Sequence, residues 1–461
     1  MIKPNWNLHQ FQMINKKILI IILLCVLLNN CSFDNKTGLW DGEEEEREAI
    51  SKIEEEQNQV INVRKIFSGE EIYSKEILLN QSIVLSEAKK NTEWKMSNLN
   101  NQNFLGNIYL SSVDNVFLKK KRGKNKFSQS KILASPLIYK NNIIYSDQKG
   151  TIFNINLDGK INWKKNIYKK IYNKIYKNLN FIVNKNIIYI SDNIGFVYAI
   201  SLDSGALIWI KNHGIPLRSN IKIFNNKIFL VNQDNRFLCL NIKDGSLLWN
   251  FRSISSFIKF QNLLSLAISD QGNVVGINSS GEIFNIDSNN GRIIWSKTLF
   301  ASGYENTTNF IKFSEIVIDN VDIVLSVGSS TFSINLKNGF TNWQQQVSSI
   351  AAPILVKKNI FLITDNGYFV VINKDSGKII SSTNILKILK KRRQKTKISG
   401  FIMGSEKFYA VTLNGYLIVS SAITGKVEYF KKIGDPITTS PIINNGKLYI
   451  LTKNSRIFGF N

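Results

Sequence analysis

Short apolar runs separated by polar turns dominate the chain from about residue 134 to its end. In the stretch 359–380, NIFLITDNGYFVVINKDSGKII, one apolar run ends at the turn Asn366-Gly367 and the next ends at the turn Ser376-Gly377. Asn and Gly at these positions supply the positive φ angles that tight hairpins need. Continuous apolar runs bounded by turn residues are typical of strands that are buried on both faces. The pattern therefore predicts strands joined by hairpin turns through most of the chain.

A glycine followed four residues later by a tryptophan recurs within this pattern. It occurs at Gly159/Trp163, Gly205/Trp209, Gly245/Trp249, Gly291/Trp295 and Gly339/Trp343, and with the Trp replaced at Gly377/Ser381 and Gly425/Tyr429. Successive motif glycines lie 38 to 48 residues apart. Such a period, with four strand-like segments per unit, is the signature of a β-propeller blade. We expect each recurrent Trp to pack its indole between adjacent blades.

The repeat count predicts how the ring closes. Seven units carry the glycine motif, whereas the C-terminal stretch 447–461 supplies inner strands and no edge strand. The stretch 91–96, NTEWKM, supplies a Trp-bearing edge strand with no inner strands before it. We therefore predict an all-β, eight-bladed propeller of four-stranded antiparallel blades over 91–461, closed by pairing these N- and C-terminal strands, which removes exposed sheet edges. Residues 97–130 are predicted to be an insertion before the first complete blade.

The N-terminal residues have the pattern of an export signal. Two lysines precede an apolar run over 18–28, which is too short for a membrane-spanning helix of about 20 residues. A short basic region followed by such a run is typical of a secretory signal peptide and favours Met13 as the start of translation. Residues 1–31 are therefore predicted to be a signal peptide that ends at Cys31.

Cys31 directly follows the apolar run, which resembles a bacterial lipoprotein signal, in which this cysteine carries lipid. Asn29 and Asn30 depart from the small residues usual at these positions, so a plain signal peptide with an incidental Cys31 is the alternative. Residues 32–90 are interpreted as a polar tether and leader. Several acyl chains would anchor such a protein without a helix. Ser32, in place of the Asp that marks inner-membrane retention in many lipoproteins, implies the periplasmic side of the outer membrane.

Composition and charge narrow the classes of partner. The 461 residues are 43% hydrophobic, enough for a large core, and their formal net charge is +25. A basic chain raises nucleic acid or an anionic surface as partners, but lysine is spread thinly through the polar turns of this chain. Two denser basic runs, 119–126 and 387–397, lack interleaved aromatic residues and are interpreted as solvated loops. We expect no nucleic-acid partner, and binding of an anionic envelope polymer by these two runs is a competing hypothesis.

Residue types that carry catalysis or bind metals are scarce after Cys31. His213, interpreted as a surface residue, is the one histidine of that region, and Cys239, interpreted as a small buried apolar residue, is its one cysteine. His-cluster metal sites, His-based nucleophile pairs and internal disulfides are therefore not expected. Asp residues fall mainly in turns, where they cap backbone amides. The sequence predicts a protein that is not an enzyme, with no catalytic or metal site and no cofactor.

The Gly-x-x-x-Trp repeat resembles the pyrroloquinoline-quinone-type propeller repeat. That repeat occurs in quinone-dependent dehydrogenases and also in propellers that bind no cofactor. The dehydrogenases carry adjacent cysteines over the quinone and a calcium or lanthanide site, whereas this chain has no adjacent cysteines. A periplasmic quinoprotein-type dehydrogenase is therefore the alternative function rather than the favoured one.

The lipoprotein-type signal, the tether and the eight repeats together resemble the BamB family, lipoprotein subunits of the outer-membrane β-barrel assembly machinery. The stretches that carry the resemblance are 68–72, 91–94, 134–152 and 434–460. The resemblance implies a non-catalytic scaffold that docks on the POTRA domains of BamA, the barrel-forming subunit. It also implies a role in the folding and insertion of β-barrel outer-membrane proteins, with their unfolded chains as further partners.

One loop carries the implied contact with BamA. In the family, a loop with two apolar residues and an Arg contacts the POTRA domains; the matching loop of this chain, 214–220, makes Ile215, Leu217 and Arg218 the partner-binding residues. Apolar side chains beside an orienting Arg form a typical interface anchor. The alternative is that Leu217 enters the next strand and Arg218 is solvated. Family members often carry acidic residues after the following blade, whereas 250–269 contains none.

Overall fold

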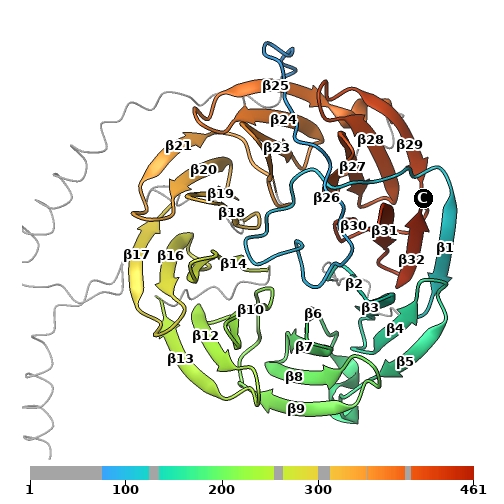
Figure 1. Cartoon of the computed structure of the whole chain (residues 1–461), viewed down its shortest axis with the longest axis vertical. Helices are drawn as coiled ribbons and strands as arrows, with labels where there is room; N and C mark the ends of the chain where they lie inside the picture. Colours follow the sequence, from blue (N-terminus) through green and yellow to red (C-terminus); the bar gives the residue numbers. More distant parts are fainter. Residues whose placement is uncertain (1–74, 124–133, 254–262, 300–311, 350, 390–395) are drawn as a thin grey trace, which may run out of the picture. The chain divides into compact units, whose positions relative to one another are not determined.

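The computed structural model describes residues 75–461 except 124–133, 254–262, 300–311, 350 and 390–395. Within these ranges the chain forms eight four-stranded antiparallel sheets, which surround a central axis as the blades of a propeller (Figure 1). The prediction of an all-β, eight-bladed propeller is confirmed. The predicted signal peptide, Cys31 and most of the predicted tether lie outside the described residues.

Blades 1 to 7 are each built from four consecutive strands, and chain order within a blade runs from the innermost strand to the outermost. The strands are β2 (Leu137–Tyr139), β3 (Asn142–Ser146), β4 (Ile152–Asn156) and β5 (Ile161–Lys165) in blade 1; β6 (Leu179–Asn184), β7 (Ile187–Asp192), β8 (Phe196–Ser201) and β9 (Leu207–Asn212) in blade 2; β10 (Lys222–Phe224), β11 (Lys227–Val231), β12 (Arg236–Asn241) and β13 (Leu247–Arg252) in blade 3; β14 (Leu266–Ile268), β15 (Asn273–Ile277), β16 (Glu282–Asp287) and β17 (Ile293–Thr298) in blade 4; β18 (Val317–Asp319), β19 (Asp322–Val327), β20 (Ser330–Asn335) and β21 (Thr341–Gln345) in blade 5; β22 (Ile354–Val356), β23 (Asn359–Ile363), β24 (Tyr368–Asn373) and β25 (Ile379–Asn384) in blade 6; and β26 (Ile398–Gly404), β27 (Lys407–Thr412), β28 (Tyr416–Ser421) and β29 (Val427–Lys432) in blade 7.

Burial follows the position of a strand within its blade. Every residue of β23 is buried, because the strand lies between neighbouring blades, whereas most of the outer strand β9 is exposed. This explains the continuous apolar runs in the sequence, since a strand covered on both faces needs no alternation. Two 3-10 helices, η3 (Lys170–Lys174) and η4 (Ile385–Ile388), lie in described loops between blades. In the described part of the chain, no helix combines the length and apolar character needed to span a bilayer.

Each recurrent Trp lies against the motif glycine of the next blade. The indole N–H of Trp163 donates to the carbonyl of Leu202 at 2.7 Å, and a Cβ added to Gly205 would lie 2.8 Å from the Trp163 ring. Two features favour glycine at position 205. The indole ring approaches too closely for a Cβ, and the backbone φ of Gly205 is +67°. The predicted packing of Trp between blades is confirmed. The same hydrogen bond recurs in the pairs Trp209–Ile242, Trp249–Ser288, Trp295–Leu336 and Trp343–Lys374.

Blade 8 closes the ring with strands from both parts of the chain. It consists of β30 (Ile442–Asn444), β31 (Lys447–Leu451), β32 (Arg456–Phe460) and, outermost, β1 (Val116–Lys121), which pairs antiparallel with β32. Pairing of an N-terminal with a C-terminal strand is therefore confirmed.

The closing strand, however, is 116–121 and not 91–96. The N–H of Trp94 donates to the carbonyl of Ile138 at 2.7 Å, on the innermost strand of blade 1. The indole of Trp94 is 2% exposed, so this segment buries its Trp near the axis. Leu118, 1% exposed, supplies the inward-facing apolar side chain of the outer strand instead. Part of the predicted insertion 97–130 thus belongs to blade 8.

Residues 84–111, which we name the central segment, run across the middle of the ring between the innermost strands (Figure 1). The segment hydrogen bonds to every blade, and most of these contacts follow the order of the blades around the ring. Phe104 also packs against the core of blades 5 and 6. For blades 1 to 8 in turn, the bonded pairs are Trp94–Ile138, Lys95–Val183, Asn100–Lys222, Asn101–Ile268, Gln102–Ile318, Val84–Asn359, Ile108–Ser405 and Ser111–Gly446.

A buried polar network holds the central segment to the blades. Lys222, with no exposed surface, donates from Nζ to the side-chain oxygen of Asn103 at 2.6 Å and to the carbonyl of Asn100 at 2.8 Å. The Nδ2 group of Asn103 donates in turn to the carbonyls of Leu266 and Ile316 at 3.1 and 2.8 Å. Buried polar groups are stable only with such partners. The axis on this side of the ring is therefore filled by the chain itself.

Candidate protein-docking surface

The loop that the family resemblance singled out joins β9 of blade 2 to β10 of blade 3. Gly214, with φ +76°, turns the chain, and its N–H donates to the side-chain oxygen of Asn212 at 2.8 Å. The N–H of His213 donates to the carbonyl of Gly195 at 2.8 Å, which ties the loop to a neighbouring turn. The start of the loop is thus fixed by backbone geometry and by hydrogen bonds.

Ile215, Leu217 and Arg218 lie at different depths in this loop. Ile215 is half-buried, whereas Leu217 is 2% exposed and belongs to the core cluster of blades 2 and 3. Arg218 is 9% exposed, and its Nη2 donates to the side-chain oxygen of Gln233 at 2.8 Å. Burial lowers the pKa of the Arg218 guanidinium, and Tyr176 opposes this effect. Ile215 is therefore the residue of the three with most surface, while Leu217 supports the loop from inside.

The turn between β7 and β8 packs directly beneath this loop. One side-chain oxygen of Asp192 accepts hydrogen bonds from the N–H groups of Ile194, Gly195 and Phe196 at 2.8 to 2.9 Å. A Cβ added to Gly195 would lie 3.1 Å from the backbone of Ile215, so the loop sits directly on this glycine. Burial raises the pKa of Asp192, and its hydrogen bonds with Tyr168 and these N–H groups oppose that rise.

A second loop, residues 166–178 between blades 1 and 2, lies against the same turn. The hydroxyl of Tyr168 donates to the second carboxylate oxygen of Asp192 at 2.5 Å. The side-chain N–H of Asn193 donates to the carbonyl of Tyr176 at 3.1 Å. This loop was not among the residues predicted to bind a partner. Its signal is the repeated spacing of Tyr and Ile among lysines in NIYKKIYNKIYKN.

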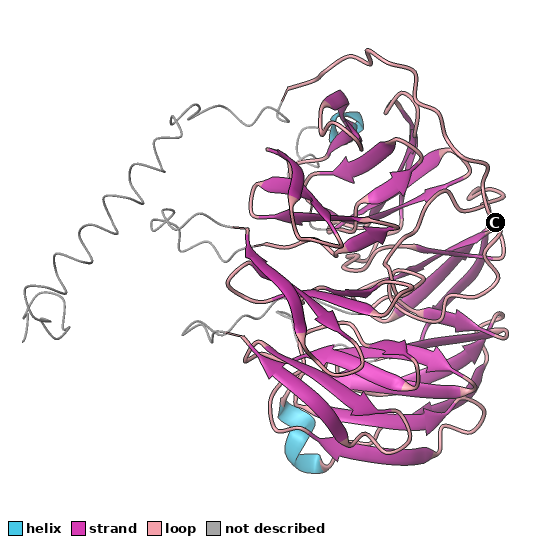
Figure 2. Ribbon diagram, turned by 60° about the vertical axis from the view of Figure 1, so that its left-hand side comes forward, coloured by secondary structure: helices cyan, strands magenta, loops and turns pink. Residues whose placement is uncertain are grey.

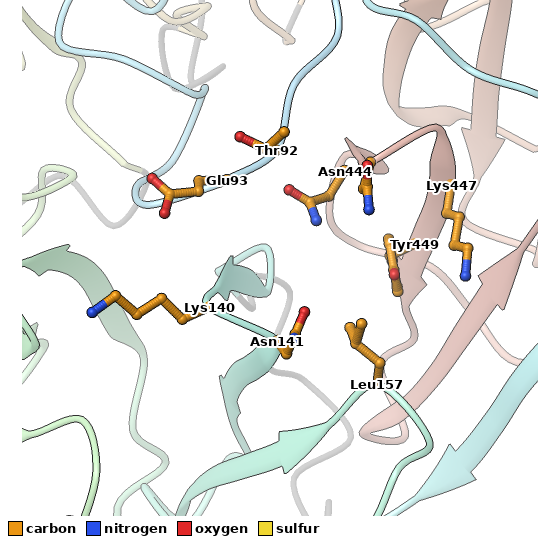
Figure 3. A pocket seen from close by; sticks show the side chains of 9 residues that line it. Thr92, Glu93, Lys140, Asn141, Leu157, Asn444, Lys447 and Tyr449 are labelled. Carbon is orange, nitrogen blue, oxygen red and sulfur yellow. The ribbon is translucent and has the colours of Figure 1, made fainter.

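A polar recess of about 150 Å³ lies between blades 8 and 1, at the ends of the strands remote from these two loops. Figure 3 shows Lys140 extending away from the other side chains that line it. Lys140 donates to the side-chain oxygen of Asn186 at 2.9 Å, and Nζ of Lys447 lies 4.5 Å from the centre of the Phe117 ring. Typical ligand pockets enclose about 300 Å³ or more, so this recess is small for an organic cofactor.

The residues around the axis do not fit a quinone cofactor of the dehydrogenase type. The central segment occupies the axis, where Asn103 is hydrogen bonded to Lys222 and to the carbonyls of Leu266 and Ile316. Cys239 is buried in β12, where burial raises the pKa of its thiol to about 12, and no second cysteine adjoins it. Within the described ranges, no three His, Cys, Asp or Glu side chains gather where they could hold a metal ion.

Comparison with known proteins finds similarity to BamB over part of the chain. A family model described as outer membrane protein assembly factor BamB matches residues 183–383. The protein of that name from Moranella endobia is 22% identical over 225 residues, covering 45% of this chain and 54% of that protein. The one from Yersinia pestis is 18% identical over 193 residues, covering 41% and 49%. The match thus spans about half the length of these relatives.

Solved structures share the fold, and another relative matches a shorter stretch of the chain. BamB from Moraxella catarrhalis superposes with a TM-score of 0.62 at 12% identity, covering 75% of this chain and 100% of that one. A quinohemoprotein alcohol dehydrogenase from Comamonas testosteroni gives a TM-score of 0.61 at 10% identity, covering 81% of each chain. A quinoprotein ethanol dehydrogenase from Pseudomonas putida is 26% identical over 149 residues, covering 28% of this chain and 24% of that protein. At such identities, likeness to the solved structures shows the fold alone.

Proposed function

Since the chain is a BamB-like propeller, we propose that it is a non-catalytic scaffold of the outer-membrane protein assembly complex. It docks on the POTRA domains of BamA and assists the folding and insertion of β-barrel outer-membrane proteins, whose unfolded chains are further partners. In this proposal Cys31 carries the lipid that holds the protein on the periplasmic side of the outer membrane.

The observation that carries the proposal is the fixed loop 212–221, which contains 214–220, the stretch that resembles the BamA-binding loop of the family. Ile215 is half-buried and Arg218 is 9% exposed, and hydrogen bonds at Gly214 and Arg218 hold the shape of the loop. Arginine is enriched among the few residues that carry most of the binding energy at protein interfaces. Because Leu217 is buried, we assign it to the support of the loop rather than to direct contact.

The filled axis supports a scaffold over the alternative, a quinoprotein dehydrogenase. The central segment takes the space around the axis, and the single described cysteine is buried with a raised thiol pKa. The similarity to quinoprotein dehydrogenases is a similarity of repeat and fold, and fold alone does not carry function. If the purified protein binds pyrroloquinoline quinone and oxidises an alcohol, the alternative replaces the scaffold.

Binding to the purified periplasmic domains of BamA tests the proposal directly. We expect Ile215→Asp to weaken the affinity by about tenfold or more, because it places a charge where an apolar side chain loses water. Arg218→Glu is expected to weaken binding as well, since it reverses the charge and breaks the hydrogen bond to Gln233. Calorimetry or surface plasmon resonance gives the Kd of each variant.

Ile423→Asp serves as the control, because Ile423 is 38% exposed in a turn of blade 7, at the other end of the strands. The control is expected to bind like the natural protein. Circular dichroism must show that each variant keeps its thermal unfolding midpoint. Unchanged affinity in both Ile215→Asp and Arg218→Glu would contradict the proposed surface, and absence of any binding by the natural protein would contradict the docking itself.

A further inference from the structure

Resting on the docking function proposed above, we propose that loops 166–178 and 212–221 form one continuous surface, which we name the two-loop surface. It binds a folded protein that presents acidic side chains around an apolar hollow. Ile171 and Ile175 are its apolar centre, and the lysines around them form its charged rim. This extends the contact beyond the three residues that match the family.

Packed contacts hold loop 166–178 in place before any partner binds. The ring of Tyr172 meets the ring of Phe196 edge-on with centroids 5.8 Å apart, and Tyr168 lies 6.5 Å from the same ring. Lys177, 2% exposed, donates its backbone N–H to the carbonyl of Gln148 at 2.9 Å, and its Nζ lies 5.1 Å from the Tyr168 ring centre. A loop fixed in advance loses little conformational freedom on binding.

The same contacts leave two isoleucines facing solvent. Ile171 is 78% exposed and Ile175 is 45% exposed, and Tyr176 beside them is 38% exposed. In Figure 2, η3 is the cyan helix at the lower end of the view, and it stands out from the neighbouring strands. A single exposed apolar side chain is ordinary. Several together on one fixed loop form a patch of the kind that marks a protein contact.

Both loops are hydrogen bonded to Asp192, in the turn between β7 and β8, and this shared support makes their surfaces continuous. The N–H of Leu217 donates to the carbonyl of Asp192 at 3.1 Å, while the hydroxyl of Tyr168 donates to the carboxylate of the same residue at 2.5 Å. The carbonyl of Tyr176, from the first loop, accepts a hydrogen bond at 3.1 Å from the side chain of Asn193, the residue after Asp192. Both loops are thus bonded to the same turn, so a partner that covers one loop also reaches the other.

Charge identifies the kind of partner. Residues 163–178 contain six lysines and no Asp or Glu, and Lys169, Lys170 and Lys174 are exposed. Opposite charge on the partner speeds association and sets orientation. An anionic bilayer would also attract lysines, but interfacial helices bury a long apolar face, whereas η3 has only five residues. What holds η3 in place is the packing of Tyr172 on Phe196. These features favour a protein.

The test compares affinity for the BamA periplasmic domains among three variants of the whole chain. We expect Ile171→Asp combined with Ile175→Asp to weaken binding about tenfold or more. Lys170→Glu combined with Lys174→Glu should weaken binding and also reduce its dependence on salt between about 0.1 and 0.5 M, because fewer charges are screened. Leu413→Asp combined with Ile423→Asp, 40% and 38% exposed on blade 7, is the matched control.

The outcomes separate this inference from the docking proposal. If Ile215→Asp weakens binding but the Ile171 and Ile175 double variant does not, the two-loop surface is wrong and the docking proposal stands. If the natural protein does not bind BamA, both the docking proposal and the two-loop surface are wrong. Vesicles of phosphatidylglycerol test the membrane reading: loss of vesicle binding in the double variant, with BamA binding unchanged, would also overturn the inference. Unchanged thermal midpoints in every variant exclude unfolding as the cause.

Discussion

Lys222 illustrates what one buried amine does at the centre of this ring. Its Nζ has no exposed surface and lies among oxygen atoms of the central segment. Burial lowers its pKa from 10.5 to about 7, and the charge of Glu315 opposes this shift. Glu315, half-buried nearby, accepts hydrogen bonds from Ser265 and Asn220 at 2.9 and 2.8 Å, and burial raises its own pKa. Protonation of the network is thus linked to folding.

The pKa of Lys222 predicts a pH-dependent stability. Between pH 7 and 10.5 the unfolded chain holds a proton on this amine more often than the folded chain does, so this residue makes the free energy of unfolding rise with pH. The stability of the natural protein relative to Lys222→Met should therefore rise by up to about 1.4 kcal/mol per pH unit between pH 7 and 9. Urea unfolding at several pH values measures this difference. Lys243→Met, in an exposed turn of the same blade, is the control, and a flat difference would contradict the prediction.

Some single residues could be predicted from the sequence and others could not, for a physical reason. Cys239 was expected to be buried and is, because its neighbours in RFLCLNI form a continuous apolar strand. Lys222 starts a similar short strand, but its burial depends on Asn100 and Asn103, more than a hundred residues away. No local pattern encodes a partner at that distance. The depth of Leu217 depends in the same way on the neighbouring blade.

The blade-to-blade contact of Trp with glycine is the element that local sequence encodes best. Trp209 donates from its indole to the carbonyl of Ile242 at 3.2 Å, and Gly245 lies directly under its ring. Where the Trp is replaced, at Ser381, the next motif glycine meets Phe369 and Thr383 instead. The repeat is visible as a period in the sequence because each blade packs against its neighbour in a similar way.

Gly245→Ala tests this contact. The backbone has φ +72°, and the new methyl group would lie 2.5 Å from the Trp209 ring, so both strain and overlap oppose it. We expect a loss of about 2 to 4 kcal/mol in the free energy of unfolding. Gly214→Ala is the matched control, with φ +76° and no atom within 4 Å of the added carbon. Urea midpoints give both values, and equal losses would show that the ring contact contributes nothing.

The sequence predicts that an N-terminal strand closes the ring by pairing with C-terminal strands, but the strand that it predicts, 91–96, is wrong. An outer strand needs few apolar residues, so VFLKKK at 116–121 looks like a solvated basic loop, while NTEW at 91–94 carries the Trp expected of an outer strand. Only the completed ring distinguishes them, because it leaves 116–121 beside β32 and draws Trp94 toward the axis. The closing strand is selected by contacts between the two ends of the propeller, which no single repeat contains.

Leu118→Asp is expected to open the ring at this seam. Leu118 of blade 8 is 1% exposed and lies against Gly159 of blade 1, so an unpaired carboxylate there should cost about 3 kcal/mol or more. Val116→Asp, at a position 44% exposed on the same strand, controls for the loss of a strand-forming residue. Hydrogen exchange of the amides in β32 reports the seam, and it should accelerate in the first variant only. Equal protection in both would mean that β1 does not seal the ring.

The path of the central segment has a consequence for how many blades the protein can have. Most of its contacts pass from blade to blade in chain order, with Trp94, Asn100, Gln102 and Ile108 reaching blades 1, 3, 5 and 7. In a ring with one repeat more or fewer, hydrogen-bond donors and acceptors at the axis would lack a protein partner. Water could not readily replace that partner, because the axis is buried. The length of the central segment therefore matches a ring of eight blades. Any duplication or loss of a repeat would demand a matching change in the length of these few residues.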